Sequence, residues 1–216
     1  MCLPMSNFFQ SRSDAAWQLA QALQHYRKRN PLILAIPRGA VPMGRILARE
    51  LQGELDVVLV RKLRAPFSRE LAVGAIDESG WVYIAPHAAV SGADDAYLER
   101  EKHTQLETLR TRRAQYTPGR PPIDAKGRVV IIIDDGLATG ATMIAALHAS
   151  RAKQPEVLIC AVPVAAPDSL ERVQPYADET ICLDAPPTFY AVGQFYGDFE
   201  QVEDQAVVAA LAPSTP

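Results

Sequence analysis

The stretch that decides the fold runs from residue 129 to residue 142. It reads Val129-Val130-Ile131-Ile132-Ile133, followed by Asp134-Asp135-Gly136-Leu137-Ala138-Thr139-Gly140-Ala141-Thr142. Five consecutive apolar residues are typical of a strand that is buried on both faces of a parallel sheet. Two acidic residues, a loop rich in glycine and threonine, and an alanine-rich segment to about Arg151 come next. This order predicts a strand, a polar loop and a helix at one edge of a sheet.

The predicted loop has the features of a phosphate site. The first N–H groups of a helix have no partner within the helix, and the helix dipole adds partial positive charge there. Such a helix start binds phosphate readily. Gly136 and Gly140 allow the backbone to turn tightly and to approach a phosphate, while Thr139 and Thr142 offer hydroxyl groups. The loop is therefore a candidate phosphate cradle.

Two adjacent carboxylates stand beside this cradle. Ionised Asp134 and Asp135 can accept hydrogen bonds from the vicinal hydroxyl groups of a sugar. A phosphate at one end and a diol at the other describe a ribose 5-phosphate. The alternative is that both acids only cap the turn and the helix. Other phosphate motifs fit poorly, because Gly140 is not followed by the lysine of a P-loop and no G-x-G-x-x-G follows a strand.

Strand and helix patterns alternate along the rest of the 216-residue chain. A first helix is predicted with Ser13 as its cap and with Trp17, Ala20, Leu23 and Tyr26 along it. Strands are predicted at 32–36, 57–60, 157–164 and 180–183, helices at about 42–51 and 94–116, and a hairpin that pairs 71–75 with 81–85. The polar helix at 94–116 is expected to be a solvated surface helix. Alternating strands and helices predict a parallel sheet covered on both faces.

The expected architecture is α/β, with one domain over residues 1–216. It consists of a mostly parallel twisted sheet with helices on both faces, a small hood that includes residues 185–200, and a β-hairpin with a flexible loop. In such sheets ligands bind beyond the carboxyl ends of the strands. The polar residues expected at those ends are Arg38, Arg61, Lys62, Asp134 and Asp135.

Composition limits the classes of function. Apolar residues make up 48% of the chain and charged residues 22%, as in an ordinary globular protein. The net charge of −3 argues against nucleic acid as a partner. No stretch approaches the roughly 18 to 20 apolar residues of a membrane span, so we expect a cytoplasmic protein. Cys2, Cys160 and Cys182 are not spaced as metal ligands or as a disulfide framework, and we assign no catalytic role to His25, His87, His103 or His148.

Residues 129–142 resemble the PRPP-binding motif of the type I phosphoribosyltransferases, in which apolar residues precede two acids and a Thr-Gly-x-Thr turn. The resemblance implies that Asp134 and Asp135 hold the ribose hydroxyl groups. It implies that the segment from Gly136 through Leu137, Ala138, Thr139, Gly140 and Ala141 to Thr142 binds the 5-phosphate. From Pro37 to Phe199 the chain also looks like a bacterial branch of predicted phosphoribosyltransferases whose acceptor is unassigned.

The resemblance extends to the ends of the first two strands. Pro37, Arg38 and Gly39 stand where the family has its pyrophosphate loop, which often contains a non-proline cis peptide, and Pro37–Arg38 is the matching bond. Arg61 and Lys62 resemble a basic pair that faces pyrophosphate ahead of a mobile loop, here residues 64–70, which lack the family's glycine-rich tip. The alternatives are a solvent-facing Arg38 and two ordinary surface cations.

The function implied by the resemblance is a Mg²⁺-dependent phosphoribosyltransferase. A nitrogenous acceptor would displace pyrophosphate from C1 of PRPP, with Asp134, Asp135, Arg38, Arg61 and Lys62 as catalytic residues. The metal would be held through PRPP, with Asp134 or Asp135 reaching it through water. A non-catalytic sensor of PRPP or nucleotide and a phosphosugar or nucleotide hydrolase are the alternatives. Family members are often dimers, which favours a homodimer.

An acceptor pocket is expected in the hood near the C-terminus. Four aromatic residues there can stack on a planar base: Phe189, Tyr190, Phe195 and Tyr196. Aromatic side chains serve equally often as packing, so these four are as readily explained as the core of the hood.

Overall fold

The larger sheet is parallel and has five strands, in the order β2-β1-β6-β7-β8. The computed structural model describes residues 9–85 and 88–212, except the side chains of residues 69 and 70. The five strands are β1 (Leu32–Ala35), β2 (Glu54–Val57), β6 (Val129–Ile133), β7 (Val157–Val164) and β8 (Glu179–Asp184). In the pairing register, Leu32 of β1 lies opposite Glu54 and Val130. The predicted fold class, a mostly parallel sheet with helices, is confirmed.

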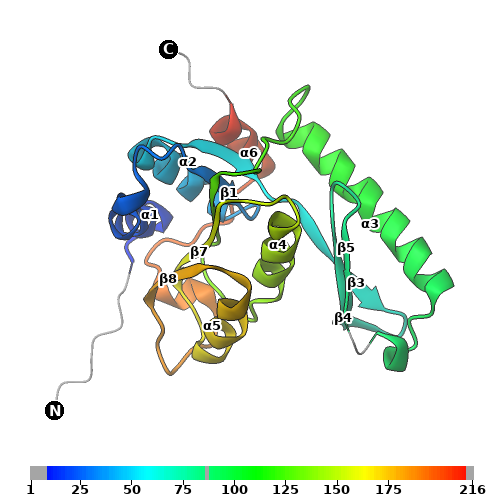
Figure 1. Cartoon of the computed structure of the whole chain (residues 1–216). Coiled ribbons are helices and arrows are strands. Elements are labelled where there is room, and N and C mark those ends of the chain that lie inside the picture. The colour runs from blue at the N-terminus through cyan, green and yellow to red at the C-terminus, as the bar shows by residue number, and fades with distance from the viewer. Residues whose placement is uncertain (1–8, 86–87, 213–216) are drawn as a thin grey trace.

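Helices cover both faces of this sheet (Figure 1). They are α1 (Arg12–Ala22), α2 (Ala40–Leu51), α4 (Ala141–Arg151), α5 (Pro167–Val173) and α6 (Asp204–Leu211). Successive residues of a strand point to opposite faces. Ile131 and Ile133 accordingly pack in the cluster that contains α1, α2 and α6, whereas Val130 and Ile132 pack in the cluster that contains α4 and α5. Burial on both faces explains the unbroken apolar run of β6.

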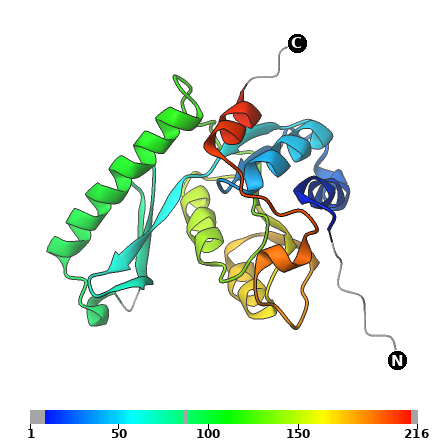
Figure 2. The same cartoon turned by 180° about the vertical axis from the view of Figure 1, so that it is seen from behind.

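A second, antiparallel sheet stands beside the first, and we call residues 60–116 the arm (Figure 2). Its strands are β3 (Val60–Ala65), β4 (Ser68–Asp77) and β5 (Val82–Ile84), and the long helix α3 (Asp95–Tyr116) packs against β3 and β4. The predicted hairpin is present, because Gly74 pairs with Ile84 and Ala75 pairs with Tyr83. Helix α4 contacts strands of both sheets and so lies between them (Figure 1).

Buried ion pairs fix the arm to the edge of the parallel sheet. The guanidinium group of Arg113, on α3, lies 2.7 Å from the carboxylate of Asp56 on β2 and also binds Glu78. It donates a further hydrogen bond of 3.0 Å to the carbonyl oxygen of Val57. The side chain of Asp56 is only 1% exposed. Helix α3 is therefore not only the solvated surface helix that its polar sequence suggests.

Aromatic side chains form a further contact between the arm and the part of the protein that contains the parallel sheet. His148, on α4, stacks on Tyr83 of β5 with a centroid distance of 4.5 Å, and it packs against Tyr176 at 4.6 Å. Tyr176 belongs to the short helix η3 (Gln174–Tyr176). Burial lowers the pKa of His148 below its ordinary value. Burial at this contact thus favours the neutral form of the imidazole.

Two local predictions were wrong, and a third stays a prediction. The first helix is capped by Ser11 and not by Ser13, because the Ser11 hydroxyl accepts the N–H of Asp14. The predicted strand 57–60 is instead the end of β2 and the start of β3, since Arg113 binds the carbonyl of Val57 where parallel pairing stops. Residues 64–70 form the tip of a hairpin in which Ala65 pairs with Ser68, and their closure over the site as a mobile loop stays a prediction.

Several short elements escaped prediction. They are helices α5 and α6 and the 3-10 segments η1 (Gln24–Tyr26), η2 (Ala89–Ser91), η3 and η4 (Val192–Phe195). Cys160 is buried and Cys182 is partly buried, and both are free thiols, as expected, whereas Cys2 and His87 lie outside the described residues. Within residues 9–85 and 88–212, no helix has the length and apolar character needed to cross a bilayer.

Candidate active site

The two acidic residues follow β6 at the carboxyl edge of the sheet. The side chain of Asp134 accepts the N–H of Asp135 at 2.9 Å. The carboxylate oxygen Oδ2 of Asp135 accepts a hydrogen bond of 2.9 Å from Nε of Arg12 and forms an ion pair with Nη2, also at 2.9 Å. Burial raises the pKa of both acids, the charge of Asp135 raises that of Asp134 further, and Arg12 opposes the shift at Asp135. Burial thus favours the protonated form of both acids, and a cation or hydrogen-bond donor bound beside them would favour the ionised form.

The loop after the acids is fixed by contacts with β7 and α5. The N–H of Leu137 donates to the carbonyl of Val164 at 2.9 Å, and the hydroxyl of Ser169 donates to the carbonyl of Ala138 at 2.8 Å. Gly140 has a φ of 71°, and a Cβ at this position would lie 2.9 Å from the side chain of Val173. Glycine is therefore required here by both the backbone conformation and the packing.

A hollow of about 160 Å³ lies over this loop. It is lined by Asp134, Gly136, Leu137, Ala138, Thr139, Gly140, Thr142 and Met143. Helix α4 begins at Ala141, and no side chain caps its first turn. The uncapped N–H groups and the two threonine hydroxyls are donors of the kind that bind a phosphate group. The structure thus gathers the predicted phosphate-binding residues and one predicted sugar-binding acid around one hollow.

The loop after β1 meets Asp135. The Pro37–Arg38 peptide bond is cis, as the resemblance implied. Gly39 is so close to the acid that a Cβ at this position would lie 2.0 Å from Oδ2 of Asp135. The guanidinium group of Arg38 lies 3.6 Å from Glu203 and 3.8 Å from Asp204, at the start of α6. The structure therefore places the predicted pyrophosphate loop directly beside the predicted sugar-binding acids.

A second hollow, of about 470 Å³, adjoins the acids on the side of the hood. Its lining residues are Arg12, Arg38, Gly39, Asp135, Val192, Phe199, Gln201 and Val202. Residues 195–198 of the hood pair with the N-terminal segment, since the N–H of Phe9 donates to the carbonyl of Phe195 and the N–H of Gly197 donates to that of Phe9. The hydroxyl of Tyr196 donates to the carbonyl of Asp135 at 2.6 Å.

Two of the four aromatic residues predicted to form an acceptor pocket are buried in the hydrophobic core. Phe195 and Tyr196 are 4% and 5% exposed and belong to the hydrophobic core. The ring of Phe189 packs on that of Phe195 at 5.1 Å, and Tyr190 is exposed. None of the four lines the 470 Å³ hollow, whose apolar wall consists of Val192, Phe199 and Val202. The alternative of a hood core is the one that the packing of Phe195 and Tyr196 supports.

The predicted basic pair lies on the arm, within β3. The guanidinium group of Arg61 binds the side chain of Gln105 on α3, and burial together with the charges of Arg112 and Arg64 lowers its pKa. Neither Arg61 nor Lys62 lines the hollows at the acids. Their predicted contact with pyrophosphate stays a prediction.

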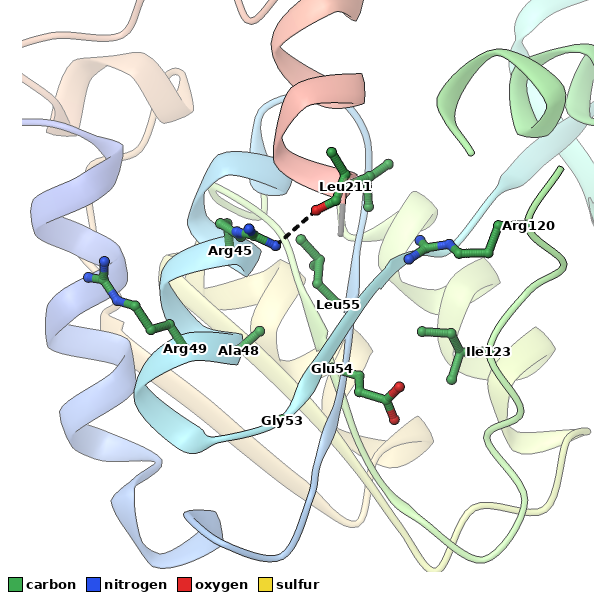
Figure 3. Close-up of a pocket in the computed structure, with 10 residues that line it drawn as sticks. Arg45, Ala48, Arg49, Gly53, Glu54, Leu55, Arg120, Ile123 and Leu211 are labelled. Atoms are coloured by element: carbon green, nitrogen blue, oxygen red, sulfur yellow. Dashed lines mark hydrogen bonds between the residues drawn. The ribbon is translucent and has the colours of Figure 1, made fainter. Parts of the chain in front are cut away.

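A third hollow lies at the opposite end of the sheet and has different chemistry (Figure 3). Its volume is about 510 Å³, and it is lined by Arg45, Ala48, Arg49, Gly53, Glu54, Leu55, Arg120, Ile123, Leu211 and Ala212. The charged groups have partners in the fold, since Arg120 pairs with Asp56 and Glu54 pairs with Arg128. Its lining residues include no helix start and no pair of acids, so the candidate active site is the one at the carboxyl edge.

Sequence reasoning missed two residues of this site. Arg12 contacts Asp135 across 123 positions of sequence, and Ser169 reaches the loop from α5. Neither residue belongs to a local motif. Only a contact between distant segments identifies them, and no spacing rule in one sequence reports such a contact.

Known proteins with similar sequences include two from Mycobacterium tuberculosis whose names place them among phosphoribosyl transferases. MT0597 (strain CDC 1551 / Oshkosh) and Rv0571c (strain ATCC 25618 / H37Rv) are each 42% identical over 205 residues, which is 94% of this chain. The alignment covers 46% of each relative, so the chain spans about half the length of these curated relatives.

The fold is also similar to a solved structure. The crystal structure of TT1426 from Thermus thermophilus superposes with a TM-score of 0.87 at 44% sequence identity, over 94% of this chain and 97% of that one. The family described as the phosphoribosyl transferase domain matches residues 6–200. Residues 134–142, the cis bond after β1 and the hood all fall inside this match. The chain belongs to the phosphoribosyl transferase family.

Proposed function

We propose that the protein is a Mg²⁺-dependent phosphoribosyltransferase, in which a nitrogenous, nucleobase-like acceptor displaces pyrophosphate from C1 of PRPP to give a ribonucleotide. One observation carries the proposal: Asp134 and the uncapped start of α4 share a single hollow of about 160 Å³. A phosphate bound at the helix start places the sugar of a ribose 5-phosphate within reach of the acids. The membership of the family, which is shown, supports the same assignment.

The reaction requires orientation of two reactants and stabilisation of a leaving group. The C1–O bond to pyrophosphate breaks ahead of attack, so positive charge develops on the sugar and negative charge on pyrophosphate. Arg38 lines the 470 Å³ hollow together with Asp135, and because Arg12 is already engaged by Asp135, we assign Arg38 to the leaving group. Arg61 and Lys62 are proposed to assist it from the arm. Either Asp134 or Asp135 accepts the proton that the nucleophile loses.

The donor set suits magnesium held mainly by substrate. Mg²⁺ prefers oxygen ligands and usually keeps several waters alongside one or two carboxylates and phosphate oxygens. Asp134 and Asp135 supply only oxygen atoms, and the described residues contain no cluster of three or more His, Cys, Asp or Glu side chains set for a metal. When bound, the ion would neutralise charge on pyrophosphate, while Asp134 or Asp135 would reach it through water.

The partners follow from the same proposal. PRPP and a small-molecule acceptor would be the ligands, and the wall of Val192, Phe199 and Val202 offers an apolar surface for the acceptor. The net charge of −3 speaks against nucleic acid as a partner. We further propose that the protein acts in the cytoplasm as a homodimer, as family members often do.

The test is calorimetric titration of the purified protein with PRPP and Mg²⁺. The double variant Asp134→Ala/Asp135→Ala should lose saturable binding, while Glu171→Ala, which removes an exposed acid on α5, should bind as the wild type does. Absence of binding by folded wild-type protein would overturn the proposal. Pyrophosphate release with a panel of nitrogenous bases then separates a transferase from a sensor of PRPP, which would bind PRPP and release none.

A further inference from the structure

We infer that Arg12 is a positioning residue for the ribose site, which holds the carboxylate of Asp135 in place and joins it to the hood. The inference rests on the proposed function, because it concerns the same sugar-binding acid. Arg12 lies in the first turn of α1, far from the motif in sequence, and its side chain is 13% exposed.

The guanidinium group of Arg12 is held on all sides. Nε donates to Oδ2 of Asp135, Nη2 lies 2.9 Å from the same oxygen as an ion pair, and Nη1 donates to the carbonyl of Glu200 at 2.7 Å. The guanidinium carbon lies 3.8 Å from the centroid of the Phe199 ring, which is a cation–π distance. Because a guanidinium is planar and rigid, a group held at Glu200 and Phe199 fixes the position of the Asp135 oxygen that Nε and Nη2 contact. Arg12 thus links the hood to Asp135, so that the position of the hood determines where the carboxylate lies.

Asp135 is confined from the other directions as well. The missing Cβ of Gly39 leaves just enough room for Oδ2, and the hydroxyl of Tyr196 binds the backbone carbonyl of Asp135. The hydrogen bond and the ion pair from Arg12 both go to Oδ2, and among the described residues no hydrogen bond is made to Oδ1. One oxygen of the carboxylate is therefore anchored, and the other is the acceptor for a ribose hydroxyl.

Removal of Arg12 is expected to affect the binding of the sugar and the binding of the phosphate differently. A carboxylate that loses its ion pair while partly buried is destabilised in the charged form and turns toward water. The phosphate loop is held by Val164 and Ser169, and these contacts do not involve Arg12. A variant at position 12 should therefore lose the recognition of ribose hydroxyl groups and keep the recognition of phosphate.

The experiment compares Arg12→Gln and Arg12→Lys with the wild type for binding of ribose 5-phosphate, 2-deoxyribose 5-phosphate and inorganic phosphate. We expect Arg12→Gln to weaken ribose 5-phosphate binding by about tenfold, or ~1.4 kcal/mol. The dissociation constant of this variant for inorganic phosphate should stay within about twofold of the wild-type value. The preference for ribose over 2-deoxyribose should disappear, and Arg12→Lys, which keeps the charge, should recover part of it.

A double-mutant cycle with Asp135→Asn distinguishes positioning from general disruption of the fold. If Arg12 acts through Asp135, the double variant binds ribose 5-phosphate no more weakly than Asp135→Asn alone, because coupled residues are not additive. Additive losses, an equal loss of phosphate binding, or an unchanged Arg12→Gln would overturn the inference. If the wild type binds neither PRPP nor ribose 5-phosphate, the proposed function fails and the inference fails with it.

Discussion

A single methyl group at position 39 tests how tightly the sugar-binding acid is enclosed. In Gly39→Ala the new Cβ would lie 2.0 Å from Oδ2 of Asp135, whereas real Cβ atoms essentially never approach below 3.0 Å, so the atoms must separate by at least about 1 Å. Gly39 has φ −56° and ψ −37°, which alanine adopts freely, so the clash alone is responsible for the effect. A displacement of this size moves Asp135 away from the position in which Arg12 holds it.

The magnitude follows from the hydrogen bonds at stake. If the carboxylate retreats from Gly39 and Arg12 does not follow it, the hydrogen bond of 2.9 Å from Nε lengthens beyond the range of about 2.7–3.2 Å in which N–H···O bonds are effective. Overpacking of this kind costs about 1–3 kcal/mol of stability. We expect a loss of about tenfold in affinity for PRPP with Mg²⁺, or ~1.4 kcal/mol.

Calorimetry for affinity and urea unfolding for stability provide the two measurements. Gly127→Ala is the matched control, because Gly127 has a φ of 67° and no atom lies within 4 Å of the position that the new methyl group would take. This control should lose about 1 kcal/mol of stability through backbone strain alone and keep its affinity. If Gly39→Ala binds PRPP within twofold of the wild type, the close fit of Gly39, Asp135 and Arg12 does not determine sugar binding, and the reasoning is refuted.

Two further predictions concern the attachment of the arm. Arg113→Met leaves Asp56 and Glu78 short of a buried partner and should lower the free energy of unfolding by about 3 kcal/mol in urea; a loss below about 1 kcal/mol would contradict the burial of this network. Burial lowers the pKa of His148 in the folded state below its ordinary value of 6.5. As the pH falls through this value, the unfolded state therefore binds more protons than the folded state, and the free energy of unfolding decreases. His148→Phe should keep the stack on Tyr83 and lose less stability than the wild type between pH 7.5 and pH 5.5; equal losses in both proteins would be contrary to this account.

The parts of the fold that could be predicted are those specified by neighbouring residues. The apolar run of β6, its two acids and the Gly-Thr loop are contiguous, so one short segment contains a strand end, a turn and a helix start. The cis bond at Pro37–Arg38 and the placement of Arg38 came from the resemblance together with the position of the loop after β1. The hairpin of β4 and β5 was visible because a turn sequence separates two strand patterns.

The remainder depends on contacts between distant segments. The boundary between β2 and β3 is set by Arg113, which is more than fifty residues away and takes the carbonyl of Val57. The sequence of the hood is the same whether its aromatic residues line a ligand pocket or pack in the core. Only the three-dimensional packing shows that Phe195 and Tyr196 are buried. Arg12 precedes Asp135 by 123 residues, and no periodicity connects them.

The pairing of Phe9 with residues 195–197 has a consequence for how the protein acquires its activity during synthesis. The contacts that hold the phosphate loop are complete once α5 has formed. The contacts that orient Asp135 are complete only when the segment around Phe9 pairs with residues 195–197. Contacts of such large sequence separation form late, because loop closure must precede them. A nascent chain that ends before residue 195 would therefore contain the entire motif and still lack an oriented sugar-binding acid. If the proposed function holds, we therefore expect sugar binding to require the completed fold, whereas phosphate binding should not.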